Sequence, residues 1–110
     1  MLTPAGNARI FLHHGPVDLR KGFEGLGGLV EQAFGAELLT GAYFIFLNRP
    51  KDRMKVLYWD SDGLAIWYKR LERGRFRSSR VANAVIDRRE FLMLLEGVTP
   101  RRMQNRFKVT

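Results

Sequence analysis

The sequence predicts an α+β fold, with a mainly antiparallel, curved sheet of about five strands and two helices. Two observations carry this prediction: the apolar residues change their period along the chain, and three consecutive apolar segments are joined by short turns. A chain of 110 residues, 45% of them hydrophobic, is long enough for one compact domain and short for two. We therefore expect a single α+β domain over residues 1–99 and a basic C-terminal tail over residues 100–110.

The N-terminal part predicts a strand followed by a helix. Residues 8–14 (ARIFLHH) form a short apolar run that ends at Gly15-Pro16, which is typical of a strand. Asp18 then offers an N-cap, and apolar residues recur at helical spacing over residues 19–34, up to a stop at Gly35. Glycines inside this helix cost up to about 1 kcal/mol each relative to alanine, so we expect close packing around them. They are Gly22, Gly25, Gly27 and Gly28.

The next three apolar segments predict an antiparallel meander. They span residues 42–49, 53–60 and 63–70, and both joints are compatible with tight hairpin turns. If Ser61 and Asp62 are the two turn residues, the second hairpin has a defined register. The opposed pairs are then Trp59 with Leu64, Leu57 with Ile66 and Lys55 with Tyr68, and Val56 and Trp67 share the other face.

The C-terminal part predicts two further strands and a second helix. Arg75-Phe76-Arg77 alternates charge and ring and could form a fourth strand, and residues 81–86 could form a fifth. Asp87 caps a helix that runs to about Gly97, and Thr99-Pro100 prevents it from continuing.

Both faces of the meander carry large apolar side chains, which indicates that a helix covers one face and that the other face is also partly covered. The residues expected to be mostly buried come from the first helix and the meander. They are Phe23, Leu26, Val30, Phe44, Phe46, Leu57, Trp59, Ile66 and Trp67.

The charge of the chain favours an anionic partner. The 19 Lys and Arg residues against 11 Asp and Glu residues give a net charge of +8, which is typical of proteins that bind nucleic acid or a membrane surface. Residues 1–48 hold three basic and four acidic residues, so the positive charge belongs to residues 49–110. The chain has no cysteine, no signal-peptide pattern and no long apolar segment, so we expect a cytoplasmic protein without membrane contact.

Motifs for catalysis or metal binding are weak. His13 and His14 are adjacent, so on a strand they point to opposite faces and cannot jointly bind one metal. The sequence DSDG at residues 60–63 resembles the start of a calcium loop, but the later ligands are missing, so a hairpin turn is the better interpretation. The Gly-x-x-Gly at residues 22–25 falls inside the helical pattern, which favours packing over a nucleic-acid clamp. We expect no metal site, no cofactor and no enzymatic activity.

The run KRLERGRFRSSR (residues 69–80) is the strongest candidate site. It places six basic residues and one acidic residue in twelve positions, and Arg outnumbers Lys five to one. Arg makes planar, bidentate contacts to phosphate and to guanine, which favours nucleic-acid contact over a merely solvated edge. A surface for an acidic protein partner is the main alternative. The predicted nucleic-acid-binding residues, including two from the tail, are Lys69, Arg70, Arg73, Arg75, Arg77, Arg80, Arg101 and Arg102.

Three blocks of the chain resemble a known family. Residues 17–30 (VDLRKGFEGLGGLV), 44–76 and 91–98 (FLMLLEGV) are similar, in order and in spacing, to the signature blocks of the TnpB-type accessory proteins of bacterial insertion-sequence family sixty-six. These proteins are unrelated to the RNA-guided nucleases that share the TnpB name. The residues that fit the family pattern are Asp18, Arg20, Lys21, Gly22, Gly25, Lys55, Trp59, Asp60, Gly63, Lys69, Arg70, Leu71, Glu72, Gly74, Arg75 and Phe76.

The resemblance implies a role in transposition, as a non-catalytic accessory to the transposase that handles the DNA of the element. The family pattern usually continues after the Phe with a Trp-Pro pair, whereas this chain has Arg77-Ser78-Ser79-Arg80. Two hypotheses stay open. In the first, the protein contacts DNA through its Arg-rich segment. In the second, it is an adaptor that binds the transposase or self-associates, as a homo-oligomer, through an apolar sheet or helix face.

Overall fold

The computed structural model describes the chain except for residues 1, 3, 5–6, 36–37, 78–83 and 96–110. In this part of the chain, five strands and two helices form an α+β fold, which confirms the predicted class. Their order is β1 (Ile10–Leu12), α1 (Phe23–Phe34), β2 (Tyr43–Leu47), β3 (Arg53–Asp60), β4 (Gly63–Arg70), β5 (Ala84–Ile86) and α2 (Arg88–Leu95).

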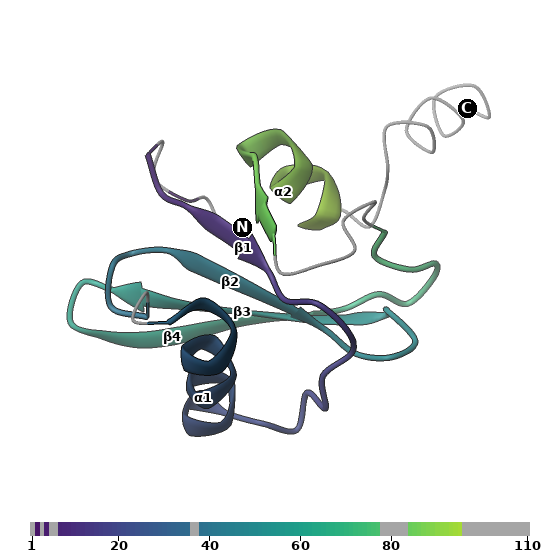
Figure 1. Cartoon of the computed structure of the whole chain (residues 1–110). Coiled ribbons are helices and arrows are strands. Elements are labelled where there is room, and N and C mark those ends of the chain that lie inside the picture. Colours follow the sequence, from purple (N-terminus) through teal and green to yellow (C-terminus); the bar gives the residue numbers. More distant parts are fainter. Residues whose placement is uncertain (1, 3, 5–6, 36–37, 78–83, 96–110) are drawn as a thin grey trace.

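The five strands form one open sheet in the order β4-β3-β2-β1-β5. The strands β1 and β2 are parallel and are connected through α1, whereas the other three neighbouring pairs are antiparallel. Figure 1 shows α1 on one side of the sheet and α2 on the other. The sheet is therefore the middle layer of the molecule, and β4 is one of its two outer strands.

The β3–β4 hairpin has the register that the sequence predicts. Trp59 lies opposite Leu64, and the two predicted pairs further along the hairpin are also present. Asp60 pairs with Gly63 across a two-residue turn, in which Ser61 adopts a φ of 60°. The DSDG sequence is thus a hairpin turn, as expected.

The first helix begins four residues later than predicted. Its N-cap is Gly22, which makes no side-chain capping hydrogen bond, so the predicted capping role of Asp18 is wrong. The Asp18 carboxylate instead accepts hydrogen bonds from the backbone N–H of Arg20 (3.0 Å) and from its guanidinium, which holds residues 18–21 in a turn. The predicted stop is confirmed, because Gly35 ends the helix with a φ of 70°.

Close packing at the helix glycines is present at Gly25. A Cβ atom at this position would lie 3.0 Å from Cβ of Lys21, closer than side chains normally approach. Gly27 would make an ordinary contact with Leu38, whereas Gly22 and Gly28 face open space. Steric demand therefore accounts for Gly25 alone among the four.

Each face of the sheet has its own apolar core, which confirms that both faces are covered. On the α1 side, the fully buried side chains include Leu26, Val30, Phe44, Phe46 and Leu57, as predicted. On the α2 side, the core contains buried residues from the segment before β1, from the strands, from α2 and from the loop after β4. These are Leu2, Ile10, Leu12, Ile45, Leu47, Met54, Val56, Phe76, Ile86, Phe91, Leu94 and Leu95.

The predicted burial of four other residues is not found. Phe23 is 49% exposed because it is the first residue of α1 and lies at the end of the apolar face. Trp59, Ile66 and Trp67 are only half-buried. They lie on the outer hairpin, where β4 has a neighbouring strand on one side only in the described part of the chain.

The segment after β4 is not a strand, so the prediction of a fourth strand at Arg75-Phe76-Arg77 is wrong. Exposed and buried side chains nevertheless alternate in this segment, since Phe76 is completely buried between two exposed arginines. The next predicted strand is present as β5, although residues 81–83 lie outside the described residues. Asp87 caps α2 as predicted, because its carboxylate accepts a hydrogen bond of 2.7 Å from the backbone N–H of Glu90. The predicted end of this helix lies outside the described residues.

Candidate nucleic-acid interface

The turn between β2 and β3 carries basic side chains and is held in shape by hydrogen bonds of Asn48. The Asn48 side-chain oxygen accepts hydrogen bonds from the backbone N–H groups of Asp52 (3.1 Å) and Arg53 (3.0 Å). The Asn48 side-chain amide donates a hydrogen bond of 2.7 Å to the carboxylate of Asp52. These bonds fix the positions from which Arg49 and Lys51 extend into solvent.

The loop of residues 71–77, which we call the arginine loop, packs against this turn. The Leu71 N–H donates a hydrogen bond to the Asp52 carbonyl, and the Phe76 N–H donates one to the Lys51 carbonyl, each of 2.7 Å. Phe76 inserts its ring into the core on the α2 side of the sheet. The loop is therefore held at three points, and Arg75 and Arg77 project from a fixed backbone.

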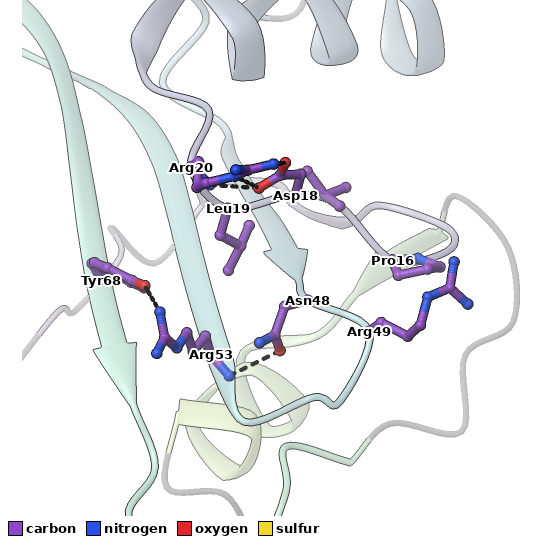
Figure 2. Close-up of a pocket in the computed structure, with 9 residues that line it drawn as sticks. Pro16, Asp18, Leu19, Arg20, Asn48, Arg49, Arg53 and Tyr68 are labelled. Atoms are coloured by element: carbon purple, nitrogen blue, oxygen red, sulfur yellow. Dashed lines mark hydrogen bonds and ion pairs between the residues drawn. The ribbon is translucent and has the colours of Figure 1, made fainter.

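A hollow of about 410 Å³ lies on one side of the turn (Figure 2). Its walls come from the segment after β1, from the β2–β3 turn and from the adjoining ends of β3 and β4. Figure 2 shows the Asp18–Arg20 pair on one wall and the Arg53–Tyr68 contact on another. The lining residues are Pro16, Val17, Asp18, Leu19, Arg20, Asn48, Arg49, Arg53 and Tyr68.

The charge around this first hollow is positive. Asp18 and Arg20 neutralise each other through an ion pair of 2.6 Å, and the hydrogen bonds from the Arg20 side chain lower the pKa of Asp18 to about 2. Arg53 is exposed and donates a long hydrogen bond of 3.4 Å to the Tyr68 hydroxyl. Among the described residues no acidic side chain pairs with Arg49 or Arg53, so two cations remain available to an anion.

A second hollow, of about 320 Å³, lies between the turn and the arginine loop. It is lined by Lys51, Arg75, Phe76 and Arg77. Within the described part of the chain, none of its three cations has an acidic partner. Arg49 lines the first hollow and Lys51 the second, so the β2–β3 turn contributes cations to both. We call the cations around the two hollows the basic surface.

The residues predicted to bind nucleic acid are not all part of this surface. Arg73, Arg75 and Arg77 are exposed, and Arg70 is exposed but pairs with Glu72 at 3.1 Å. Lys69 lies on the other face of β4 from Arg70, and its ammonium donates a hydrogen bond of 2.7 Å to the Leu95 carbonyl at the end of α2. Three of the predicted residues lie outside the described residues. They are Arg80, Arg101 and Arg102.

Replacing Lys69 by methionine should test its structural role. The substitution keeps most of the length of the side chain but removes a charged donor from the C-terminal end of α2, so the free energy of unfolding should fall by about 1 kcal/mol. Arg73→Gln, which removes an exposed charge nearby, should change stability by less than about 0.5 kcal/mol. Urea denaturation of both variants measures the difference, and equal stabilities would contradict a structural role for Lys69.

Several residues of the family pattern stabilise the fold and are not part of the basic surface. The Lys55 ammonium donates a hydrogen bond of 2.9 Å to the Lys21 carbonyl, just before α1, and lies 5.0 Å from the centre of the Tyr68 ring. Asp60 and Gly63 close the β3–β4 hairpin, and Trp59 is half-buried beside it. Gly74 has a φ of 77°, which a glycine adopts without strain inside the arginine loop.

Sequence reasoning missed three cations, Arg49 and Lys51 in the turn and Arg53 at the start of β3. The signal was present in the sequence NRPKDRMK (residues 48–55), where a basic residue occurs at every second position. A turn between two short apolar segments is exposed, so basic residues there lie on the surface. The sequence could not show that the arginine loop folds back onto this turn.

No metal site is found in the described ranges of the chain, which contain no group of three or more His, Cys, Asp and Glu side chains that could hold an ion. His13 packs against the rings of Phe34 and Phe46, and burial lowers the pKa of this histidine. None of the described helices is long and apolar enough to cross a membrane.

Comparisons with known proteins agree with the resemblance in the sequence. The family model of IS66 Orf2-like proteins matches residues 8–105. Two relatives come from Sinorhizobium fredii (strain NBRC 101917 / NGR234). Uncharacterized protein y4jC is 34% identical over 100 residues, which cover 89% of this chain and 86% of the relative. Uncharacterized protein y4hO is 31% identical over 112 residues, which cover 100% and 97% of the two chains. No solved structure matches the chain significantly. With a match over most of its length, this chain belongs to the family of IS66 Orf2-like proteins, the accessory proteins of an insertion sequence.

Proposed function

We propose that this protein is a non-catalytic accessory factor for transposition that contacts the phosphate backbone of DNA through the basic surface around the β2–β3 turn. The observation that carries the proposal is the set of cations around the two hollows that have no acidic partner among the described residues. They are Arg49, Lys51, Arg53, Arg75 and Arg77.

The positions of these cations suit a polyanion better than a small acidic ligand. They come from the turn, from β3 and from the arginine loop, so they are spread over two hollows rather than converging on one point. Four of the five are arginines, whose planar guanidinium groups form bidentate hydrogen bonds with phosphate. Contacts of this kind fix a protein on DNA without reading its sequence.

Like charges at the end of the outer hairpin support the same proposal. Arg53 and Arg70 lie directly opposite each other in β3 and β4, an arrangement that destabilises a strand pair. Their guanidinium groups bond to different partners, Arg53 to Tyr68 and Arg70 to Glu72. A phosphate group near Arg53 would offset this repulsion, so DNA binding would stabilise the end of the hairpin.

A binding experiment across a salt series tests the proposal. The purified protein is titrated with duplex DNA from the ends of the insertion sequence and with unrelated duplex DNA of the same length. We expect binding to both, with an affinity that falls linearly in log–log form as salt rises, because neutralised phosphates release counterions. Absence of binding at low salt would contradict the proposal and would favour the adaptor hypothesis, which pull-down of the transposase would then test.

A further inference from the structure

Among the residues that the structure describes, no strand pairs with the outer edge of β4. This strand is eight residues long, and within the described part of the chain it pairs only with β3. Its pairing with β3 is continuous from Gly63 to Arg70, so no bulge turns the edge away from solvent, and the strand contains no proline. Soluble proteins usually blunt such an edge, because its unpaired backbone groups are a template for another strand.

The charges of β4 do not protect its middle. Lys69 is directed to the carbonyl of Leu95, and Arg70, which is exposed and pairs with Glu72 at 3.1 Å, lies at the C-terminal end of the strand. The four residues from Leu64 to Trp67 are apolar and only half-buried, and Tyr68 is 49% exposed. An acidic residue, Asp62, lies in the turn just before the strand. The edge is therefore apolar in the middle, acidic at its start and basic at its end.

We propose that a second copy of this chain pairs with this edge, β4 against β4, in an antiparallel dimer whose two-fold axis passes beside Ile66. Antiparallel pairing of two identical strands places the start of each strand beside the end of the other. The acidic start of β4 thus meets the basic end of the partner's β4. The two sheets join into one continuous sheet, with the α1 sides on one face and the α2 sides on the other.

The register follows from the faces of the sheet and from the charges. Opposed residues must point to the same face, so two-fold pairing is centred on a single residue of β4. Centring on Ile66 places Asp62 opposite Arg70 of the partner subunit, which pairs opposite charges twice in the dimer. Centring on Trp67 instead places Asp62 opposite Glu72 of the partner subunit, which pairs like charges twice. Charge complementarity therefore selects the register centred on Ile66.

The selected register also covers the exposed side chains of the strand. Tyr68 lies opposite the partner's Leu64, and Trp67 lies opposite Ala65 of the partner subunit. Cross-strand contacts of an aromatic ring with an apolar side chain stabilise a strand pair. The dimer thus covers both partly exposed rings of β4 at once.

Disulfide formation between single introduced cysteines tests the register. The chain has no cysteine of its own, so each variant reports one position. In the proposed dimer the two copies of Ile66→Cys face each other with Cβ atoms about 5 Å apart, close enough to form a disulfide under mild oxidation. In Leu64→Cys the two cysteines are separated by four residues along the strands, roughly 13 Å, so this control should stay uncrosslinked. Crosslinking of both variants alike, or of neither while both are folded, would overturn the proposal.

A charge exchange provides a second test in the uncrosslinked protein. Asp62→Arg and Arg70→Glu should each weaken the dimer about tenfold, because each converts two ion pairs per dimer into like-charge pairs. The double variant D62R/R70E restores opposite charges and should recover most of the affinity. Sedimentation equilibrium measures the dissociation constants, and a monomeric wild-type protein, or a double variant weaker than both single variants, would contradict the proposal. DNA binding through Arg49, Lys51, Arg53, Arg75 and Arg77 does not depend on this outcome, so either proposal can fail alone.

Discussion

Replacing Phe76 by alanine should lower the free energy of unfolding by about 3–5 kcal/mol, the usual cost of truncating a fully buried ring. The Phe76 side chain has no exposed surface and packs among strand and α2 residues, so the substitution leaves a cavity in the core on that side of the sheet. A loss of this size would unfold a large fraction of a marginally stable domain. Chemical denaturation followed by circular dichroism measures the effect.

Phe23→Ala is the matched control, because it makes the same chemical change at a ring that is 49% exposed. We expect this variant to lose less than about 1.5 kcal/mol, since much of the ring is already in contact with water. Equal losses for the two variants would contradict the placement of Phe76 in the core. A stable Phe76→Ala variant would likewise show that the arginine loop is not anchored by its ring.

Replacing all five cations of the basic surface by glutamine should reduce the affinity for duplex DNA by as much as about 3 × 10⁴-fold at 0.1 M salt. The five are Arg49, Lys51, Arg53, Arg75 and Arg77. This upper limit follows if each cation neutralises one phosphate, because every contact then contributes roughly eightfold at that salt concentration. Fluorescence anisotropy with a labelled duplex measures the affinity.

The five-residue variant should fold, because all five side chains are exposed and none has an acidic partner among the described residues. Gln replaces each cation with a polar side chain, so the surface stays soluble. An affinity within about twofold of the wild type would show that DNA, if bound, is bound elsewhere.

Much of the fold could be predicted because its elements have a clear period and clear turns. The β3–β4 hairpin was predicted most completely. The sequence DSDG indicates a two-residue turn at Ser61-Asp62, and this turn fixes every residue pair of the hairpin. The end of α1 at Gly35 and the cap of α2 at Asp87 follow from local chemistry in the same way. The start of α1 could not be predicted as well, because Asp18 bonds to Arg20 instead of capping the helix.

The candidate site was less predictable, because it depends on contacts between distant parts of the chain. The alternation in Arg75-Phe76-Arg77 suggested a strand, and three residues are too few to show that Phe76 enters the core from a loop. Lys69 belongs to the same run, yet its hydrogen bond to a residue 26 positions later makes it structural. Arg49 and Arg53 belong to the site because the turn and the segment around Arg20 line the same hollow, a contact that the sequence does not show. A run of like charges therefore indicated a basic surface but not which of its members form it.

The salt dependence of DNA binding by a double variant tests the central claim most directly. Arg75→Gln with Arg77→Gln removes two cations from the second hollow, and Lys21→Gln with Arg89→Gln removes two exposed cations that line neither hollow. If both arginines contact phosphates, the slope of log affinity against log salt should become shallower by about 2 in the first variant and should stay unchanged in the second. A folded R75Q/R77Q variant that binds DNA with the wild-type slope would contradict the account.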